Sequence, residues 1–270
     1  MNTAIFGEKV SLVAKSPTLW NRAYEHFQIP NKMLKIDLMD KDFYVRFKKL
    51  VIELEIFGGL LASPLKKMQL NKALGLNIID EIEVKNCFKF ENDKINTKNF
   101  DVEAMFNVLN AKTNINQVSK LLVMGYGALG ESVIEHVIMT QKIEDIFIFT
   151  RGDLYTLQNR KLIKFTGNAP IFDLILNCSK KAGPLNERDF PVEKEYLGRL
   201  SECKYIFNAN YGMKQDVLRD YAKENLIPYS DGKDMNRIQA ALSFNYVNST
   251  SIRISELIKV MDPESKVEYV

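Results

Sequence analysis

The sequence predicts an α/β fold with two domains. Short apolar runs alternate with helical patterns along the first third of the chain, and the alternation begins again at Leu121 after a polar stretch, 111–120. Strands that are short, apolar and separated by helices indicate a parallel sheet covered on both faces. With 270 residues, 46% of them apolar, the chain can form two medium-sized domains with sizeable cores.

In the first domain, strands are expected over Asn2–Phe6, Met33–Leu38 and Phe57–Leu61, with Gly58 and Gly59 breaking the third. Helices are expected over these four ranges: Pro17–Phe27, Asp42–Leu54, Pro64–Leu74 and Asp101–Asn110. Ser16 is expected to be the N-cap of the first helix, and Asn99 or Asp101 lies near the cap of the last. Residues 81–90 are expected to be extended and to turn at 91–94.

In the second domain, we expect five strands with helices between them: Leu121–Gly125, Ile146–Thr150, Asp173–Asn177, Tyr205–Asn208 and Ile227–Tyr229. Residues 1–110 are therefore assigned to the first domain and 111–234 to the second. The C-terminal helices, within 235–270, are expected to pack back on the first domain. We expect a cleft between the domains.

Composition and charge narrow the function classes. A net charge of +3 without a long basic run argues against nucleic acid or a membrane surface as the main partner. Cys87, Cys178 and Cys203 lack CxxC spacing, which is typical of a reducing cytoplasm. His26 and His136 have no metal-ligand neighbours, so neither a metal site nor a Ser-His-Asp mechanism is expected. No secretory signal and no apolar run of membrane-spanning length is seen.

The most informative segment is the glycine-rich stretch 125–130, which follows the apolar run Leu121–Met124 and precedes a helical pattern. Strand, glycine turn and helix form the setting of a dinucleotide fingerprint. Gly125 permits the tight turn, Gly127 lets backbone N–H groups approach a pyrophosphate, and Gly130 lets the helix pack closely on the strand. The expected cofactor-binding residues here are Gly125, Gly127, Ala128, Leu129 and Gly130. The alternative is a glycine turn that only packs.

Five separated segments resemble, in the same order, the shikimate/quinate dehydrogenases. They are 7–17, 60–66, 84–87, 97–101 and 231–240. The resemblance implies a cytoplasmic NAD(P)-dependent oxidoreductase of aromatic amino acid biosynthesis, a monomer or homodimer. It would transfer a hydride reversibly between nicotinamide and a cyclic hydroxy or keto acid, such as shikimate or 3-dehydroshikimate or a less polar relative. The alternative is a non-catalytic regulatory protein that binds NAD(P) or a small ligand on the same fold.

The resemblance places the catalytic pair at Lys66 and Asp101. Lys66 stands in Pro64-Leu65-Lys66, at the position of the family's catalytic lysine, and Asp101 stands at the head of a helix, at the position of its catalytic aspartate. Burial can favour a neutral lysine, and a neighbouring carboxylate can orient it. We expect Lys66 to be the acid/base and Asp101 its partner, within hydrogen-bond reach. Alternatively, Lys66 and Lys67 face solvent and Asp101 only stabilises a helix start.

The resemblance also implies four substrate-binding residues, Ser16, Asn86, Tyr211 and Gln239. Ser16 matches a serine that holds the substrate carboxylate, Asn86 would bind a ring hydroxyl, and Gln239 would reach the substrate from the last helices. Each also has a purely structural interpretation, as a helix cap, a turn residue or a polar helix position. Tyr211 lies in a segment that departs from the family pattern.

Three positions depart from the family in the same way: Ala14, Leu60 and Ala62 are apolar where polar residues are expected. A carboxylate held there would lose hydrogen-bond donors, so recognition of shikimate is expected to be impaired. Alternatively, Ser11 and Ser16 hold the carboxylate together and Ser63 replaces the missing threonine.

The choice of cofactor depends on residues that follow the second strand of the nucleotide-binding domain. Arg151 matches the family arginine that contacts the 2′-phosphate of NADP, whereas Asp153 could bind the free ribose 2′-hydroxyl of NAD. Thr150 belongs to the same segment, and Gly232 is expected to approach the nicotinamide. We expect NADP, with NAD as the alternative. Arg151 and Asp153 could also be a solvated loop pair.

Overall fold

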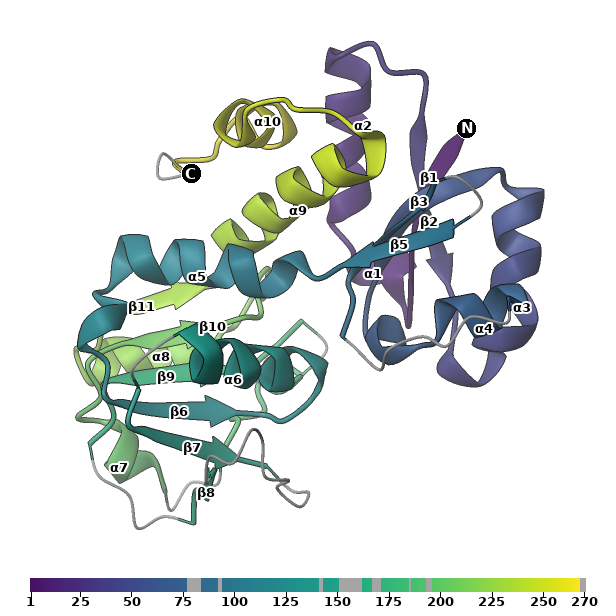
Figure 1. Ribbon diagram of the computed structural model, residues 1–270. Coiled ribbons are helices and arrows are strands. Elements are labelled where there is room, and N and C mark those ends of the chain that lie inside the picture. The colour runs from purple at the N-terminus through teal and green to yellow at the C-terminus, as the bar shows by residue number, and fades with distance from the viewer. Residues whose placement is uncertain are drawn as a thin grey trace. The chain divides into compact units, whose positions relative to one another are not determined.

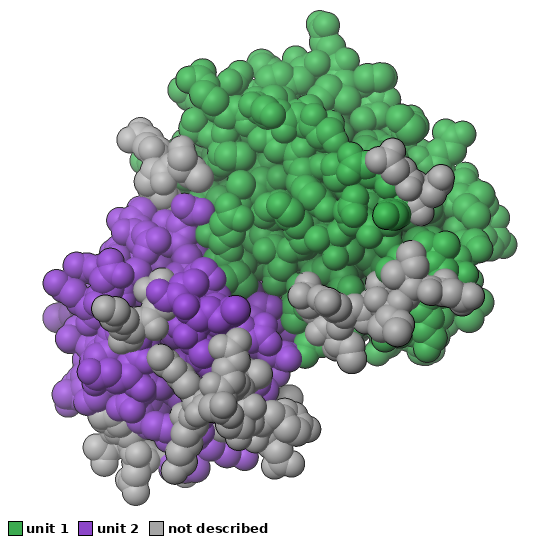
Figure 2. All heavy atoms as spheres, viewed as in Figure 1, with its two compact units in different colours: residues 1–104, 236–270 green, residues 105–235 purple. Residues whose placement is uncertain are grey.

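The computed structural model describes residues 1–76, 84–91, 94–140, 143–150, 162–166, 171–184, 186–192 and 196–267. They form two compact units (Figures 1 and 2), unit 1 with residues 1–104 and 236–270 and unit 2 with residues 105–235. The divisions fall inside helix α5 (Phe100–Lys112) and helix α9 (Lys233–Asn248). The domain boundaries and the cleft expected from the sequence stay predictions.

Unit 1 contains a mixed five-stranded sheet in the order β2-β1-β3-β4-β5. The first three strands are parallel, and β4 and β5 continue the sheet in antiparallel fashion. The strands are β1 Asn2–Gly7, β2 Lys32–Asp37, β3 Ile56–Leu61, β4 Cys87–Glu91 and β5 Lys94–Lys98. Apart from α5 and α9, the helices are α1 Val10–Val13, α2 Ser16–His26, α3 Asp40–Glu53, 3₁₀ helix η1 Leu65–Lys67, α4 Leu70–Leu74 and α10 Ile254–Met261.

Both faces of this sheet are covered. Helices α3 and α4 lie on one side, and α2 and α9 lie on the other (Figure 1). On the first side, Phe6 of β1 packs against Phe47 of α3, with ring centroids 5.0 Å apart, in a cluster rich in aromatic residues. On the second side, Trp20 of α2 lies 5.4 Å from Phe244 of α9 and donates its indole N–H to the carbonyl of Ala240 at 3.0 Å. The C-terminal helices therefore complete the core of unit 1.

Three sequence predictions in unit 1 are wrong in detail. Gly58 and Gly59 do not break β3, because a side chain at 59 would place Cβ only 1.9 Å from the carbonyl oxygen of Ala4, so the close approach to β1 needs glycine. The expected helix 64–74 is divided into η1 and α4. Ser16 is not an N-cap, because Lys15 precedes the helix and Ser16 is its first residue.

Unit 2 contains a six-stranded parallel sheet in the order β11-β10-β9-β6-β7-β8. Its strands are β6 Lys120–Met124, β7 Asp145–Phe149, β8 Ile163–Lys164, β9 Leu174–Asn177, β10 Ile206–Asn208 and β11 Tyr229–Asp231. Its helices are η2 Ile115–Gln117, α6 Ala128–Thr140, α7 Leu197–Leu200 and α8 Val217–Glu224. Figure 1 shows α6 in front of the sheet and α8 behind it. The predicted α/β fold class is confirmed, although the short strands β5 and β8 were not expected.

Within the described ranges, no helix combines the length and the apolar character that crossing a membrane requires.

Asp173 fastens the start of β9 to the start of β6. Its carboxylate accepts hydrogen bonds from the backbone N–H groups of Ser119 and Lys120 at 2.9 and 3.0 Å, and it pairs with the ammonium of Lys204 at 2.7 Å. Burial opposes ionisation, but Lys204 and these donors outweigh it and hold the pKa of Asp173 well below its usual range.

This lowered pKa gives a pH-dependent stability prediction. A carboxylate whose pKa is lower in the folded state stabilises the fold above its unfolded pKa of about 4, and that contribution is lost as the pH falls further. Asp173→Asn should lower the free energy of unfolding at neutral pH by about 1–3 kcal/mol. In denaturant titrations, the difference should shrink below about pH 4. The control Asp220→Asn, at an exposed position of α8, should change stability by no more than about 0.5 kcal/mol. A constant difference at every pH would contradict the assignment.

Candidate active site

The structure brings Lys66, Asp101 and Asn86 together in unit 1. The ammonium of Lys66 donates to Oδ2 of Asp101, and the amide Nδ2 of Asn86 donates to Oδ1 of the same carboxylate at 2.8 Å. The Lys66 side chain is 18% exposed and that of Asp101 is 11% exposed. The carboxylate is thus held at both oxygens in a nearly dry setting, and the expected Lys66–Asp101 contact is confirmed.

Local backbone structure explains this arrangement. Lys66 lies in η1, directly after the carboxyl end of β3, and its carbonyl accepts from the backbone N–H of Lys85 at 2.8 Å. Asn86 lies just before β4, and its Oδ1 accepts from the backbone N–H of Phe100, the first residue of α5, at 2.9 Å. Asn99 accepts from the backbone N–H of Asp101 at 3.2 Å, as expected of a residue near the helix start. Asn86 therefore fixes Asp101 and the helix that carries it.

Gln239 on α9 is paired with a residue that the sequence analysis did not select. Its Nε2 donates to Oγ of Ser243, one helical turn later, at 2.8 Å. Ser243 also lies beside the buried thiol of Cys87. Burial raises the pKa of that thiol, and the nearby charge of Asp101 raises it further. The only sequence signal for Ser243 is its i, i+4 spacing from Gln239.

The serines expected near a carboxylate differ in their surroundings. Ser16 is 4% exposed, and its hydroxyl makes no hydrogen bond within the described ranges. Ser11 donates its hydroxyl to Asp37 at 2.5 Å, so it already has a protein partner. Ser63 is exposed. This arrangement disfavours the alternative in which Ser11 and Ser63 replace the missing polar groups.

The apolar departures lie around the carboxyl ends of neighbouring parallel strands. Leu60 is buried and stands between Ile5 of β1 and Cys87 of β4 in the sheet register. The backbone N–H of Ala62 donates to the carbonyl of Phe6 at 2.7 Å. Ala14 follows α1 in the loop after β1.

In unit 2, the glycine turn joins β6 to α6 as predicted. Gly125 has φ +99°, a conformation that disfavours side chains, and a Cβ at Gly130 would lie 2.0 Å from the carbonyl oxygen of Gly125. A Cβ at Gly127 would meet nothing within 4 Å. Internal packing therefore explains the glycines at 125 and 130, whereas the open space at 127 fits a ligand that approaches the backbone. Ala128 and Leu129 open α6, so their N–H groups lie at its N-terminus.

The structure describes only some of the other residues that are expected to contact the cofactor. Thr150 follows β7 at the carboxyl edge of the parallel sheet, whereas Arg151 and Asp153 lie outside the described residues. Gly232 follows β11, and a Cβ there would lie 2.1 Å from the carbonyl oxygen of Ala209, so chain packing alone accounts for this glycine. Tyr211 is half-buried in the loop after β10.

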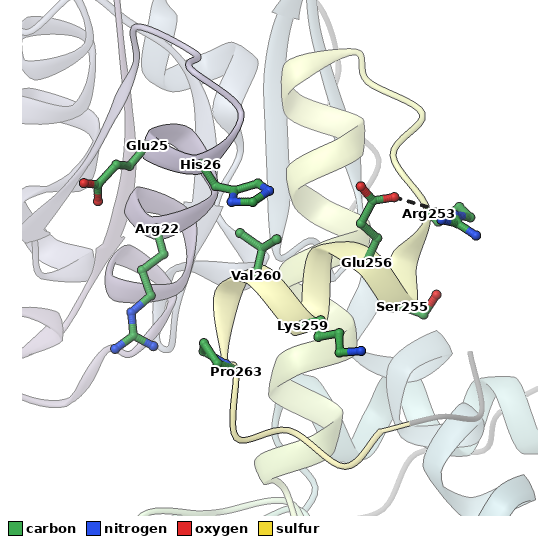
Figure 3. Close-up of a pocket in the computed structure, with 9 residues that line it drawn as sticks. All are labelled: Arg22, Glu25, His26, Arg253, Ser255, Glu256, Lys259, Val260 and Pro263. Carbon is green, nitrogen blue, oxygen red and sulfur yellow. Dashed lines mark ion pairs between the residues drawn. The ribbon is translucent and has the colours of Figure 1, made fainter.

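A hollow of about 720 Å³ lies elsewhere on unit 1, between α2 and α10 (Figure 3). Arg253 pairs with Glu256 at 3.5 Å, and Arg22 donates to the carbonyl of Met261 at 3.1 Å. Because both arginines already have protein partners, we place the functional site at Lys66 rather than in this hollow. Across the described residues, no group of three or more His, Cys, Asp or Glu side chains could hold a metal ion.

Fold and side chains together define an α/β protein with a Rossmann-type unit and a lysine–carboxylate pair. No family model matches the chain. It is 30% identical over 178 residues to the shikimate dehydrogenase (NADP(+)) of Helicobacter acinonychis, covering 65% of each chain. It is 25% identical over 248 residues to the enzyme of the same name from Clostridium botulinum, covering 88% of this chain and 93% of the relative. Matches to Helicobacter pylori enzymes cover a third of their length.

Solved structures share the fold over nearly the whole chain. Shikimate dehydrogenase 1 from Peptoclostridium difficile superposes with a TM-score of 0.80 at 20% identity, covering 100% of this chain and 99% of that one. The Thermus thermophilus enzyme, solved with NADP(H) and shikimate, gives 0.74 at 18% identity, covering 97% and 99%. The 5-ketofructose reductase of a Gluconobacter strain gives 0.71 at 15% identity, covering 97% and 98%. The chain is therefore similar in sequence to shikimate dehydrogenases and shares their fold.

Proposed function

We propose that this chain is an NADP-dependent oxidoreductase that interconverts a cyclic hydroxy acid and its keto form, as its relatives' names indicate for shikimate. The observation that carries the proposal is the cluster of Lys66, Asp101 and Asn86. A protein that only bound a ligand would have no need of a partly buried lysine paired with a carboxylate held at both oxygens.

Lys66 is the acid/base of the proposed reaction. Oxidation of a secondary alcohol removes a proton from oxygen. The neutral amine of Lys66, fixed beside Asp101, accepts that proton in the oxidation, and its ammonium returns the proton in the reverse reduction. Asp101 cannot rotate freely, since Asn86 holds its second oxygen. Asn86 retains a second amide hydrogen on Nδ2, which it can donate to a substrate hydroxyl. Ser16, Tyr211 and Gln239 are the other proposed substrate ligands.

The cofactor belongs at the β6–α6 turn. Gly127 leaves open space beside the backbone, and the N-terminus of α6 favours a pyrophosphate. When bound there, NADP supplies the hydride acceptor or donor. Thr150, Arg151 and Asp153 would line the adenosine ribose, with Arg151 on the 2′-phosphate, and Gly232 would approach the nicotinamide. NAD remains the alternative cofactor.

The remaining proposals concern setting and partners. The chain is proposed to act in the cytoplasm, in aromatic amino acid biosynthesis, as a monomer or homodimer. Its partner is a small molecule rather than nucleic acid or a membrane. The domain assignment, 1–110 with 235–270 and 111–234, is part of the same proposal.

An absorbance screen tests the function directly. Purified protein is mixed with NADP⁺ or NAD⁺ and with shikimate, quinate or related cyclic hydroxy acids, and formation of the reduced cofactor is followed. We expect turnover with at least one acid and a preference for NADP⁺. Binding of NADP⁺ by calorimetry without turnover of any acid would instead favour the non-catalytic regulatory alternative.

A further inference from the structure

Helix α9 carries two buried polar side chains that are hydrogen-bonded to each other. Gln239 is 6% exposed and Ser243 is fully buried, and one turn of helix places both on the same face. Ser243 also lies beside the buried Cys87 of β4. The two side chains therefore form a buried, hydrogen-bonded polar pair on α9.

The side-chain amide of Gln239 is hydrogen-bonded to the protein through its nitrogen, and its oxygen is available to a ligand. Its hydrogen bond within the described part of the chain uses Nε2. Among the described side chains, no fully buried nitrogen or oxygen lacks a hydrogen-bond partner. Oε1 of Gln239 therefore reaches accessible surface, where it can accept a hydrogen bond from a ligand.

We propose that Ser243 is a positioning residue that sets the orientation of the Gln239 amide, so that Oε1 is presented to a hydroxyl group of the substrate. Oγ of Ser243 accepts the hydrogen bond from Nε2 of Gln239 at 2.8 Å, which fixes the end of the amide that is held inside the protein. Without Ser243, the side-chain amide of Gln239 can flip and present its NH₂ group to the substrate, and an NH₂ group cannot accept a hydrogen bond. This inference rests on the proposed function and extends it to a residue that does not touch the substrate.

A double-mutant cycle tests the inference. The variants are Ser243→Ala, Gln239→Ala and the double variant, assayed with the best substrate from the screen. Loss of one uncharged hydrogen bond corresponds to a factor of about 3–10. Ser243→Ala should therefore raise KM about 3- to 10-fold while kcat changes less than about 2-fold. In the Gln239→Ala background, the same change should have no further effect on KM, because Ser243 acts through the amide.

Controls separate this role from a structural one. Ser255→Ala, at an exposed position of α10, should leave KM unchanged. Ser243→Thr keeps the hydroxyl group and should therefore have a KM close to that of the wild type. A lower thermal midpoint of Ser243→Ala with unchanged KM would show a packing role and overturn the inference. The inference would also be overturned if the KM increases of the two single variants multiply in the double variant, because the two residues would then act independently.

The cycle also distinguishes this inference from the proposed function. If the wild-type chain turns over no hydroxy acid, the proposed function fails, and the cycle is then measured by calorimetry on the Kd for the cyclic hydroxy acid of the screen that binds most tightly. The same pattern in Kd would support the role of Ser243 in a binding protein, whereas no binding of any acid of the screen would contradict both proposals.

Discussion

Replacing Lys66 by alanine should lower kcat by about 10²–10⁴-fold, the range that general acid–base catalysis contributes. The affinity for NADP⁺ should stay within about 2-fold, because the proposed cofactor residues lie in unit 2 whereas Lys66 belongs to unit 1. The fold should persist, since Asn86 still donates to Oδ1 of Asp101 at 2.8 Å and the carboxylate stays in the first turn of α5. Steady-state kinetics, cofactor titration and a thermal scan measure the three quantities.

Lys67→Ala is the matched control for this prediction. The two lysines are consecutive in η1, but Lys67 is exposed, so its loss should change kcat less than about 2-fold. Asp101→Asn should also lower kcat strongly, since an amide cannot orient or tune the ammonium as a carboxylate does. Equal turnover of Lys66→Ala and the wild type would remove Lys66 from the mechanism.

The sequence was sufficient for features that depend on local patterns. The β6–turn–α6 unit follows from an apolar run, three glycines and a helical period, and all of these lie within one stretch of chain. The alternation of strands and helices was likewise predictable. Gly59 shows the limit of such reasoning. The carbonyl of Ala4 that excludes a side chain at position 59 belongs to β1, which is adjacent in the sheet but distant in sequence.

In the candidate site, too, the sequence predicts some features and not others. Lys66 and Asp101 could be named because each lies in a recognisable segment, but no local pattern shows that Asn86 holds the second oxygen of Asp101. The contact of Ser243 with Cys87 joins residues more than 150 positions apart. Contacts of this kind depend on how α9 packs on the sheet, and tertiary packing is not encoded in the hydrophobic period of either segment.

Shikimate should be a poor substrate, with kcat/KM below about 10⁴ M⁻¹s⁻¹, and the preferred substrate should be less polar at the end away from the reacting hydroxyl. Leu60 is buried between Ile5 and Cys87, and Ala14 and Ala62 have methyl groups where the resemblance to the shikimate/quinate dehydrogenases predicts hydroxyl groups. A carboxylate entering such a surface sheds water without gaining donors. The screen of hydroxy acids measures this preference directly.

Restoring the polar residues should recover activity with shikimate. A hydrogen bond to a charged group contributes about 1.5–3 kcal/mol, so Ala14→Ser with Ala62→Thr should raise kcat/KM for shikimate by about 10-fold or more. Adding Leu60→Asn should raise it further, provided that a thermal scan shows the triple variant folded, because position 60 is buried in β3.

Ala62→Val is the matched control for this restoration, since valine has the shape of threonine without the hydroxyl group. It should give no gain, and an equal gain would mean that volume rather than hydrogen bonding limits shikimate. Efficient turnover of shikimate by the unmodified chain would show that Ser16 suffices for the carboxylate, because Ser11 is already bonded to Asp37. The apolar residues at 14, 60 and 62 would then have no part in specificity.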